Sequence, residues 1–422
     1  MTSLHNDLIV DTAPSATGLL GNRWWVVFGS VLGMIAGQGA TTIFIFGTFV
    51  GPVTSDLGIS QSSFSAALLI LTIAAAVVTP WTGHMMDKHG VRPVMLPMIT
   101  LFAVATAALA FMQSSLALIY ALFAIQGAFS AIQAPTGYVK VISRRFDRQR
   151  GLACGLAMAG VGLGVALLPQ YIAILMTHYG WRGAYLGLGA FIFVMAFIPV
   201  ALFVRDAPGQ TAAMHRERSA DLPGLTVSEA VKGTRQFWLL VIGLSLAVMA
   251  INGVLAQLVV MLSKRGFTIP EAATVMSIAG LAMILGRVLV GYCLDKYHGS
   301  YVAMAVFSFP VIGILLLLSG ASGPVPYIAA ILCGLGIGAE LDLMGFLVSR
   351  YFGLRAIGTI YGILFAIFVI GSGVGPYLVS LSFEHAQSYA PVLEGFIVAL
   401  LVVIAMMAFL GPYRYPVAHD SN

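Results

Sequence analysis

Long apolar stretches recur along the whole 422-residue chain, and the short segments between them hold most of the charged residues. Each stretch has close to the roughly 20 residues that a helix needs to cross a bilayer. Backbone groups in lipid must be hydrogen-bonded within the protein, and no stretch alternates like a barrel strand, so we predict helices. The pattern predicts twelve of them, at about residues 24–49, 62–84, 93–113, 116–142, 151–177, 182–204, 237–262, 271–293, 301–319, 325–348, 357–381 and 389–411.

The composition indicates that lipid is the main solvent of this chain. Hydrophobic residues make up 59% of it and charged residues only 9%, whereas a soluble domain carries about a quarter charged residues. Its three cysteines, Cys154, Cys293 and Cys333, lie inside apolar stretches, so we expect no disulfide framework, metal site or cofactor. Residues 1–22 are polar and acidic, which is unlike a cleaved signal peptide.

Lysine and arginine are distributed unequally between the two sets of loops. Sixteen lie in loops on the side of the termini, three lie in the opposite loops, and Lys140 and Arg287 lie within spans. Under the positive-inside rule, this asymmetry predicts a multi-pass protein of a prokaryotic inner membrane with both termini in the cytoplasm. The net charge of +5 is therefore a topology signal, and we expect no nucleic-acid partner. The three opposite residues are Arg182, Lys264 and Arg265.

The two halves of the chain share landmarks at a nearly constant offset, which indicates an internal repeat of six helices. A hydrophilic stretch rich in proline and glycine separates them. We therefore predict a tail at 1–22, one half at 23–205, a linker at 206–235, a second half at 236–412 and a tail at 413–422. The matched landmarks are Gly83 and Asp87 with Gly291 and Asp295 (offset 208), Ser143, Arg144 and Phe146 with Ser349, Arg350 and Phe352 (206), and Gly155 and Pro169 with Gly362 and Pro376 (207).

These features resemble the major facilitator superfamily, whose fold is all-α and consists of two parallel six-helix repeats with the substrate near the midplane. The segment from Gly83 through Asp87 to Arg92 is similar to that superfamily's loop between its second and third helices, and Gly291–Gly299 echoes it. The resemblance covers about residues 20–412. It implies that Gly83, Asp87, Arg92 and Asp295 govern conformational change rather than substrate binding.

Other motifs resemble the branch of oxalate/formate antiporters and monocarboxylate transporters. They are the opening Gly18–Trp24, the segment Arg145–Ala153, and Gly286-Arg287 followed by Gly291 and Asp295-Lys296. The resemblance implies that the arginine of the eighth helix, Arg287 here, binds the substrate carboxylate.

Arg287 is also singled out by its position alone. It lies eight residues before Asp295, roughly 12 Å along the helix, which is beyond easy reach of the membrane surface. A buried cation in a membrane helix is costly and therefore a functional candidate, and a guanidinium suits a carboxylate. The alternative is a permanent ion pair with Glu340 or Asp342, and competition between substrate and such a pair is compatible with both.

Glu340 and Asp342 are the carboxylates that lie well inside a span. They are two residues apart, so they face different sides of their helix. Gln126, Gln133 and Lys140 repeat every seven residues in the fourth helix, which predicts one polar stripe, and the repeat offset matches Gln133 with Glu340. We therefore expect Glu340 to face the pathway and to carry a proton, and Asp342 to meet a neighbouring helix or serve as a second coupling group.

Further polar residues interrupt apolar helices and could line the substrate pathway or join helices. We predict that Gln38, Thr41 and Thr42 share one face of the first helix. Lys140 is near enough to the cytoplasmic end to extend into the headgroup region. The remaining candidates for substrate contact are Gln133, Asn252, Gln257 and Tyr361.

The chain departs from its resembling families at two places. Oxalate/formate antiporters carry a second cation in the eleventh helix, whereas the stretch 363–370 has none, which favours a monoanion. Animal-type monocarboxylate transporters have an acidic residue one turn before the helix-8 arginine and a lysine on the first helix. This chain has Met283 at the former position and no lysine on its first helix, so Glu340 is the candidate proton carrier.

The combined prediction is a monomeric secondary transporter for a small, lactate-like monocarboxylate, coupled to protons and working by alternating access. Larger aromatic acids remain possible substrates. An organic-anion exchanger of the oxalate/formate type is the nearest alternative, and a transport-like membrane sensor is a second. No metalloprotease, serine-hydrolase or P-loop motif occurs in the sequence, so we predict no enzymatic activity.

Overall fold

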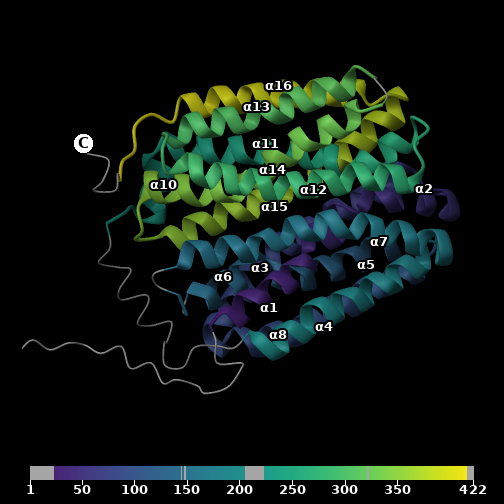
Figure 1. The fold of residues 1–422 in the computed structure, drawn as a ribbon, viewed down its shortest axis with the longest axis horizontal. Coiled ribbons are helices and arrows are strands. Elements are labelled where there is room, and N and C mark those ends of the chain that lie inside the picture. The colour runs from purple at the N-terminus through teal and green to yellow at the C-terminus, as the bar shows by residue number, and fades with distance from the viewer. Residues whose placement is uncertain (1–22, 144, 147–148, 205–222, 321–322, 416–422) are drawn as a thin grey trace, which may run out of the picture.

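The computed structural model describes residues 23–143, 145–146, 149–204, 223–320 and 323–415. The predicted tail at 1–22, most of the predicted linker and residues 416–422 lie outside the described residues. The regular elements of the described part are all helices, and one isolated bridge joins Gly224 and Gly353. Its helices form two layers, with the first half of the chain below and the second half above in Figure 1.

The first layer contains the helices that precede residue 205. These are α1 (Trp24–Ile35), η2 (Gly39–Ile43), α2 (Phe46–Leu57), α3 (Gln61–His89), α4 (Val91–Ala108), η3 (Leu109–Phe111), α5 (Leu116–Ser130), η4 (Ala131–Gln133), α6 (Pro135–Ser143), α7 (Arg150–Ile192), η5 (Phe193–Phe197) and α8 (Ile198–Phe203). The second layer contains α10 (Val227–Gly233), α11 (Arg235–Ser263), α12 (Ile269–Leu294), α13 (Gly299–Leu318), α14 (Val325–Phe352), α15 (Ile357–Ala386) and α16 (Ala390–Ala408).

Eleven helical segments in the described part of the chain are long and apolar enough to cross a membrane. One of them, 53 residues long, runs from Gly151 to Phe203 and contains Gly180 at a positive φ of 64°. The hydroxyl of Tyr171 donates to the carbonyl of Gly187 at 3.1 Å, although a straight helix would separate residues 16 positions apart by roughly 24 Å. The segment is therefore two helices that fold back on each other at Gly180, a conformation that favours glycine.

The predicted first and fourth spans are interrupted rather than continuous. The first contains a π-helical turn at Gly39–Ile43 between α1 and α2. The fourth passes from α5 through a 3-10 turn to Ala134, whose ψ of 148° is extended, before α6 begins at Pro135. Proline disfavours the helical conformation of the residue before it, which explains the second break.

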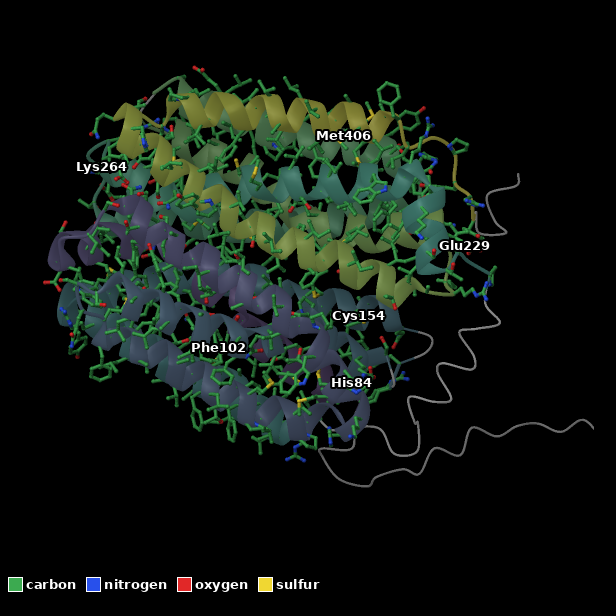
Figure 2. All side chains as sticks on the ribbon, turned by 180° about the vertical axis from the view of Figure 1, so that it is seen from behind. His84, Phe102, Cys154, Glu229, Lys264 and Met406 are labelled. Carbon is green, nitrogen blue, oxygen red and sulfur yellow. The ribbon has the colours of Figure 1, made fainter. Side chains whose placement is uncertain are left out.

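The two ends of the bundle differ in what they carry. Figure 2 places Glu229 of α10 at one end, which also carries the C-terminal segment and which we call the terminus end, and Lys264 at the opposite end. The halves meet along two helix pairs, α3 with α15 and α7 with α12, and α2 packs on α11.

Glycines allow the backbones of the two halves to approach closely at these crossings. A Cβ added at Gly280 of α12 would lie 2.4 Å from the backbone nitrogen of Ala166 in α7. One added at Gly373 of α15 would lie 2.0 Å from the hydroxyl oxygen of Thr72 in α3. Small residues at helix crossings are typical of membrane bundles.

Candidate functional site

A central cavity of about 120 Å³ lies between the two halves and contains Arg287. Helices from both halves contribute to its wall. The lining residues are Met34, Gly37, Gln38, Gly39, Ile43, Phe44, Gln133, Ala134, Pro135, Val161, Asn252, Met283, Arg287, Ile337, Leu341, Phe365, Phe368, Val369 and Ser372.

Arg287 is held in this wall by α12, and its side chain is 10% exposed. Its Nη1 lies 3.4 Å from Oδ1 of Asp342 on α14. Close guanidinium–carboxylate bonds are about 2.7–2.9 Å, so this ion pair is loose. A guanidinium has five N–H donors, and no other hydrogen bond of Arg287 is found within the described residues. The arginine can therefore donate hydrogen bonds to a second carboxylate.

A second cavity of about 230 Å³ lies nearer the terminus end. Pro135 and Leu341 line both cavities, so the two are adjacent. Asp342 and Tyr361 line the second cavity from the C-terminal half, and Cys154 lines it from the N-terminal half. Figure 2 shows Cys154 between the two layers, toward the terminus end.

Glu340 does not face the central cavity as expected, whereas Asp342 meets a neighbouring helix as expected and also lines the second cavity. Asp342 lines the second cavity and pairs with Arg287. Glu340 is 0% exposed and lines neither of these two cavities. One turn earlier on the same face of α14, Gly336 packs against Pro310 of α13, so this face points into the C-terminal half.

The physical reason for the unexpected orientation of Glu340 is the break in the fourth span. Gln133 ends the 3-10 turn before Pro135, whereas Glu340 sits within the uninterrupted α14. The repeat offset therefore matches their positions in sequence but not their directions around a helix. Neither carboxylate oxygen of Glu340 has a hydrogen-bond partner among the described residues.

The polar stripe predicted on the fourth span does not form, for the same reason. Gln126 donates to Thr106 at 3.0 Å inside the first half. Gln133 accepts a 2.6 Å bond from the hydroxyl of Tyr138 and lines the central cavity. Lys140 forms an ion pair with Asp87 of α3.

Three amide side chains expected on the substrate pathway, Gln38, Gln133 and Asn252, do line the central cavity. Nε2 of Gln38, Nε2 of Gln133 and Oδ1 of Asn252 are buried and have no hydrogen-bond partner in the described part of the chain. Thr41 and Thr42, expected beside Gln38, are buried away from the cavity. The π-helical turn changes the helical period there, so the i, i+3 and i+4 spacing no longer places all three residues on one face.

Gln257 was predicted to contact the substrate, but it lies outside the central cavity in this conformation. It is 0% exposed, and its Nε2 lies 2.9 Å from Oγ of Ser65, 2.9 Å from Oγ of Ser380 and 3.2 Å from the carbonyl of Pro376. The two serine hydroxyls are themselves hydrogen-bonded at 2.6 Å. Because Ser65 belongs to α3 and the others to α11 and α15, this Gln257 cluster joins the two halves near the opposite end.

The residues of the loop motif stay within their own halves. Asp87 pairs with Lys140, and Arg92 donates to the carbonyl of Ala201 in α8. Asp295 is the C-cap of α12. A Cβ at Gly83 would meet no atom within 4 Å, so close packing does not require glycine there.

Sequence reasoning missed several residues of the site. Phe44, Phe365 and Phe368 line the central cavity and were hidden among many apolar positions. The only signal for Phe365 and Phe368 was the absence of a cation from 363–370, and Phe44 had none. Ser65 and Ser380 could be noticed only as single hydroxyls within apolar helices.

Comparison with known proteins identifies the family. The profile of the Major Facilitator Superfamily matches residues 29–376. The oxalate:formate antiporter of Oxalobacter formigenes is 30% identical over 53% of this chain, and the matched region spans about half of that antiporter, 52%. Monocarboxylate transporter 12 of Homo sapiens is 24% identical over 57% of this chain and 51% of its own.

A longer alignment links the chain to a transporter of a different acid. The hexuronate transporter of Escherichia coli is 25% identical over 93% of this chain and 92% of its own. These relatives are transporters rather than enzymes. Because the profile match covers far more than half of its residues, this chain belongs to the major facilitator superfamily.

Proposed function

We propose that this protein is a secondary transporter of a small organic monocarboxylate, coupled to protons and working by alternating access. Arg287 binds the substrate carboxylate, and Gln38, Gln133 and Asn252 provide further polar contacts. The observation that carries the proposal is the loose ion pair between Arg287 and Asp342, 3.4 Å long, at the boundary of two adjacent cavities.

The topology proposed with this function is two six-helix repeats. The hairpin at Gly180 turns the 53-residue segment into two crossings, which would raise the eleven segments to twelve. The excess of lysine and arginine in loops on the side of the termini supports a cytoplasmic terminus end in an inner membrane.

The proposed conformation is closed at the opposite end and accessible from the terminus end. The Gln257 cluster joins the halves at the closed end, where Nε2 of Gln170 in α7 also donates to Thr274 in α12 at 2.8 Å. The second cavity, adjacent to the central one, supplies the route toward the terminus end. The loop-motif aspartates would exchange partners when the other state forms.

In the proposed coupling, the two carboxyl groups have different roles. Asp342 neutralises Arg287 while the substrate is absent and is displaced when a substrate carboxylate arrives. Glu340 has no partner for either oxygen, and a buried charge without a partner is costly. We therefore propose that Glu340 is protonated in this conformation and loses its proton in the other one. Tyr361, beside Asp342 in the second cavity, would guide the substrate.

Exchange of two anions is the second candidate function, because the chain is similar to an oxalate:formate antiporter. The same Arg287 site would serve, and neither carboxyl group would need to titrate.

The test is counterflow uptake of labelled mono- and dicarboxylates into proteoliposomes, with and without an inward proton gradient. We expect gradient-driven uptake of a monocarboxylate that is abolished by Arg287→Gln. The matched control is Arg182→Gln, because Arg182 pairs with Asp56 at 2.6 Å but lies exposed at the opposite end. Uptake only against a preloaded anion, indifferent to pH, would indicate exchange. Carboxylate uptake that survives Arg287→Gln would refute the site.

A further inference from the structure

The wall of the central cavity is apolar except around the groups that would hold a carboxylate. Fourteen of its nineteen lining residues carry no polar side chain. Ser372 is one of the other five, but its hydroxyl already donates to the carbonyl of Val369 at 2.6 Å. The polar groups that remain are Arg287, Gln38, Gln133 and Asn252.

The number of unpaired hydrogen-bond donors in the cavity wall suits one carboxylate group. Nε2 of Gln38 and Nε2 of Gln133 are donors without partners, and Arg287 supplies further donors from the other half. A carboxylate accepts about four hydrogen bonds, so one such group would occupy these donors. Oδ1 of Asn252 is the unpaired acceptor in this wall. The cavity therefore offers little to a second acid group or to several hydroxyl groups.

An aromatic ladder runs along α15 from the second cavity to the central one. Tyr361 and Phe365 stack with ring centroids 6.1 Å apart and planes 11° apart, and Phe365 and Phe368 stack at 6.1 Å and 16°. Tyr361 lines the second cavity, whereas Phe365 and Phe368 line the central one, with Phe44 contributed by the other half. Aromatic walls of this kind favour flat or apolar groups.

The volume of the cavity limits the size of the substrate. Its volume is about 120 Å³, and an apolar cavity of about 150 Å³ in another protein holds benzene. A chain of a few carbons or a single ring fits beside the arginine.

We propose that the substrate is a monocarboxylate with an apolar tail, short alkyl or monocyclic aryl, whose tail packs against Phe365, Phe368 and Phe44 while Arg287 holds its carboxylate. This inference rests on the proposed function and names its substrate class. It separates the chain from transporters of dicarboxylates and of polyhydroxylated acids, for which the cavity lacks polar partners.

The experiment is calorimetric titration of the purified full chain with acetate, propionate, butyrate, benzoate, oxalate and glucuronate. Burial of one methylene stabilises a complex by an amount equal to about fourfold in affinity, so affinity should rise about fourfold per carbon from acetate to butyrate. We expect benzoate to bind most tightly, and oxalate and glucuronate on the order of a hundredfold more weakly than benzoate.

Variants test which side chains create the preference. Phe368→Ala and Phe365→Ala should each reduce the ratio of benzoate to acetate affinity about tenfold, since they remove part of the apolar wall. Phe409→Ala is the matched control, because this phenylalanine is 67% exposed and lies outside the cavity. Should either variant fail to fold, the ligand series on the unaltered chain still decides the question.

The outcomes separate the two proposals. Affinity that does not increase with the tail, or oxalate that binds as well as benzoate, would overturn the apolar-tail inference and leave the carboxylate site standing. Binding of no carboxylate at all would overturn both. A rising series that Phe368→Ala flattens and Phe409→Ala does not would support the inference.

Discussion

Replacing Gln257 by leucine should weaken the contact between the two halves at the opposite end. In the present conformation its amide bridges α3 of the first half and α15 of the second through Ser65, Ser380 and the carbonyl of Pro376. Leucine has a similar volume and no hydrogen-bonding group. The change therefore removes the bond from the amide to α3 without opening a large void, while the bond between Ser65 and Ser380 still joins the halves.

The expected magnitude follows from the number of hydrogen bonds lost. Nε2 carries two hydrogens, so it serves two of its three close acceptors at a time. Only the bond to Ser65 crosses between the halves, and at about 1 kcal/mol net its loss should shift the ratio of the two states about fivefold against this conformation. Ser65 and Ser380 keep their mutual bond of 2.6 Å, so the substitution leaves neither hydroxyl unpaired.

The assay is the rate at which a maleimide labels Cys154, which lines the second cavity. The background would carry Cys293→Ser and Cys333→Ala, so that one thiol remains. If the two states start near balance, a fivefold shift lowers the accessible fraction from about one half to about one sixth. A cysteine introduced at Ser62, close to the Gln257 cluster in sequence, should become more reactive in parallel.

The matched control is Gln126→Leu. Gln126 is equally buried, at 1% exposed, and its amide also donates to a hydroxyl, but its partner Thr106 belongs to the same half. We expect that variant to lose stability without changing the labelling of Cys154. Equal labelling in the Gln257→Leu protein and its parent, at both reporter positions, would refute the view that the cluster closes this end.

Three further substitutions test other parts of the site. Asp342→Asn should strengthen carboxylate binding by Arg287 about three- to tenfold in a titration, because the competing carboxylate is gone; weaker binding would contradict competition. Glu340→Gln should leave the melting temperature nearly unchanged but abolish accumulation driven by a proton gradient, while counterflow persists; strong destabilisation would mean that Glu340 is charged. Gly280→Leu should prevent the close crossing and lower Cys154 labelling, whereas Gly395→Ala, with nothing within 4 Å of the added carbon, should not.

The helical architecture could be predicted because backbone groups in lipid must be hydrogen-bonded within the protein, and a helix satisfies this within a single segment. The apolar pattern, the glycine-rich motifs and Arg287 pointed to a major facilitator transporter, and the family is confirmed. The interruptions at Gly39–Ile43 and Ala134 were not predicted, since an apolar run has the same pattern whether or not its helix is continuous.

Those interruptions explain most of the errors about the site. Arguments from spacing place two residues on one face only while the helix keeps its period, and the π-helical turn and the break before Pro135 both change it. The orientation of Glu340 was wrong because it was inferred from Gln133 across such a break. Asn252 and Gln257 both lie on the uninterrupted α11, and the structure assigns one to each of the two roles considered for them, since Asn252 lines the cavity and Gln257 joins helices.

The glycine crossings between the halves have a consequence for how transport speed can evolve. At Gly280 the backbones of α12 and α7 lie close together, and at Gly373 the backbone of α15 lies close to the side chain of Thr72 in α3, so little side-chain volume separates the halves at these two points. A larger residue there changes the rate of the movement and the equilibrium between the two conformations without reaching the cavity. Turnover rate and substrate choice can therefore be adjusted independently, by changes at the seam and at the cavity wall respectively.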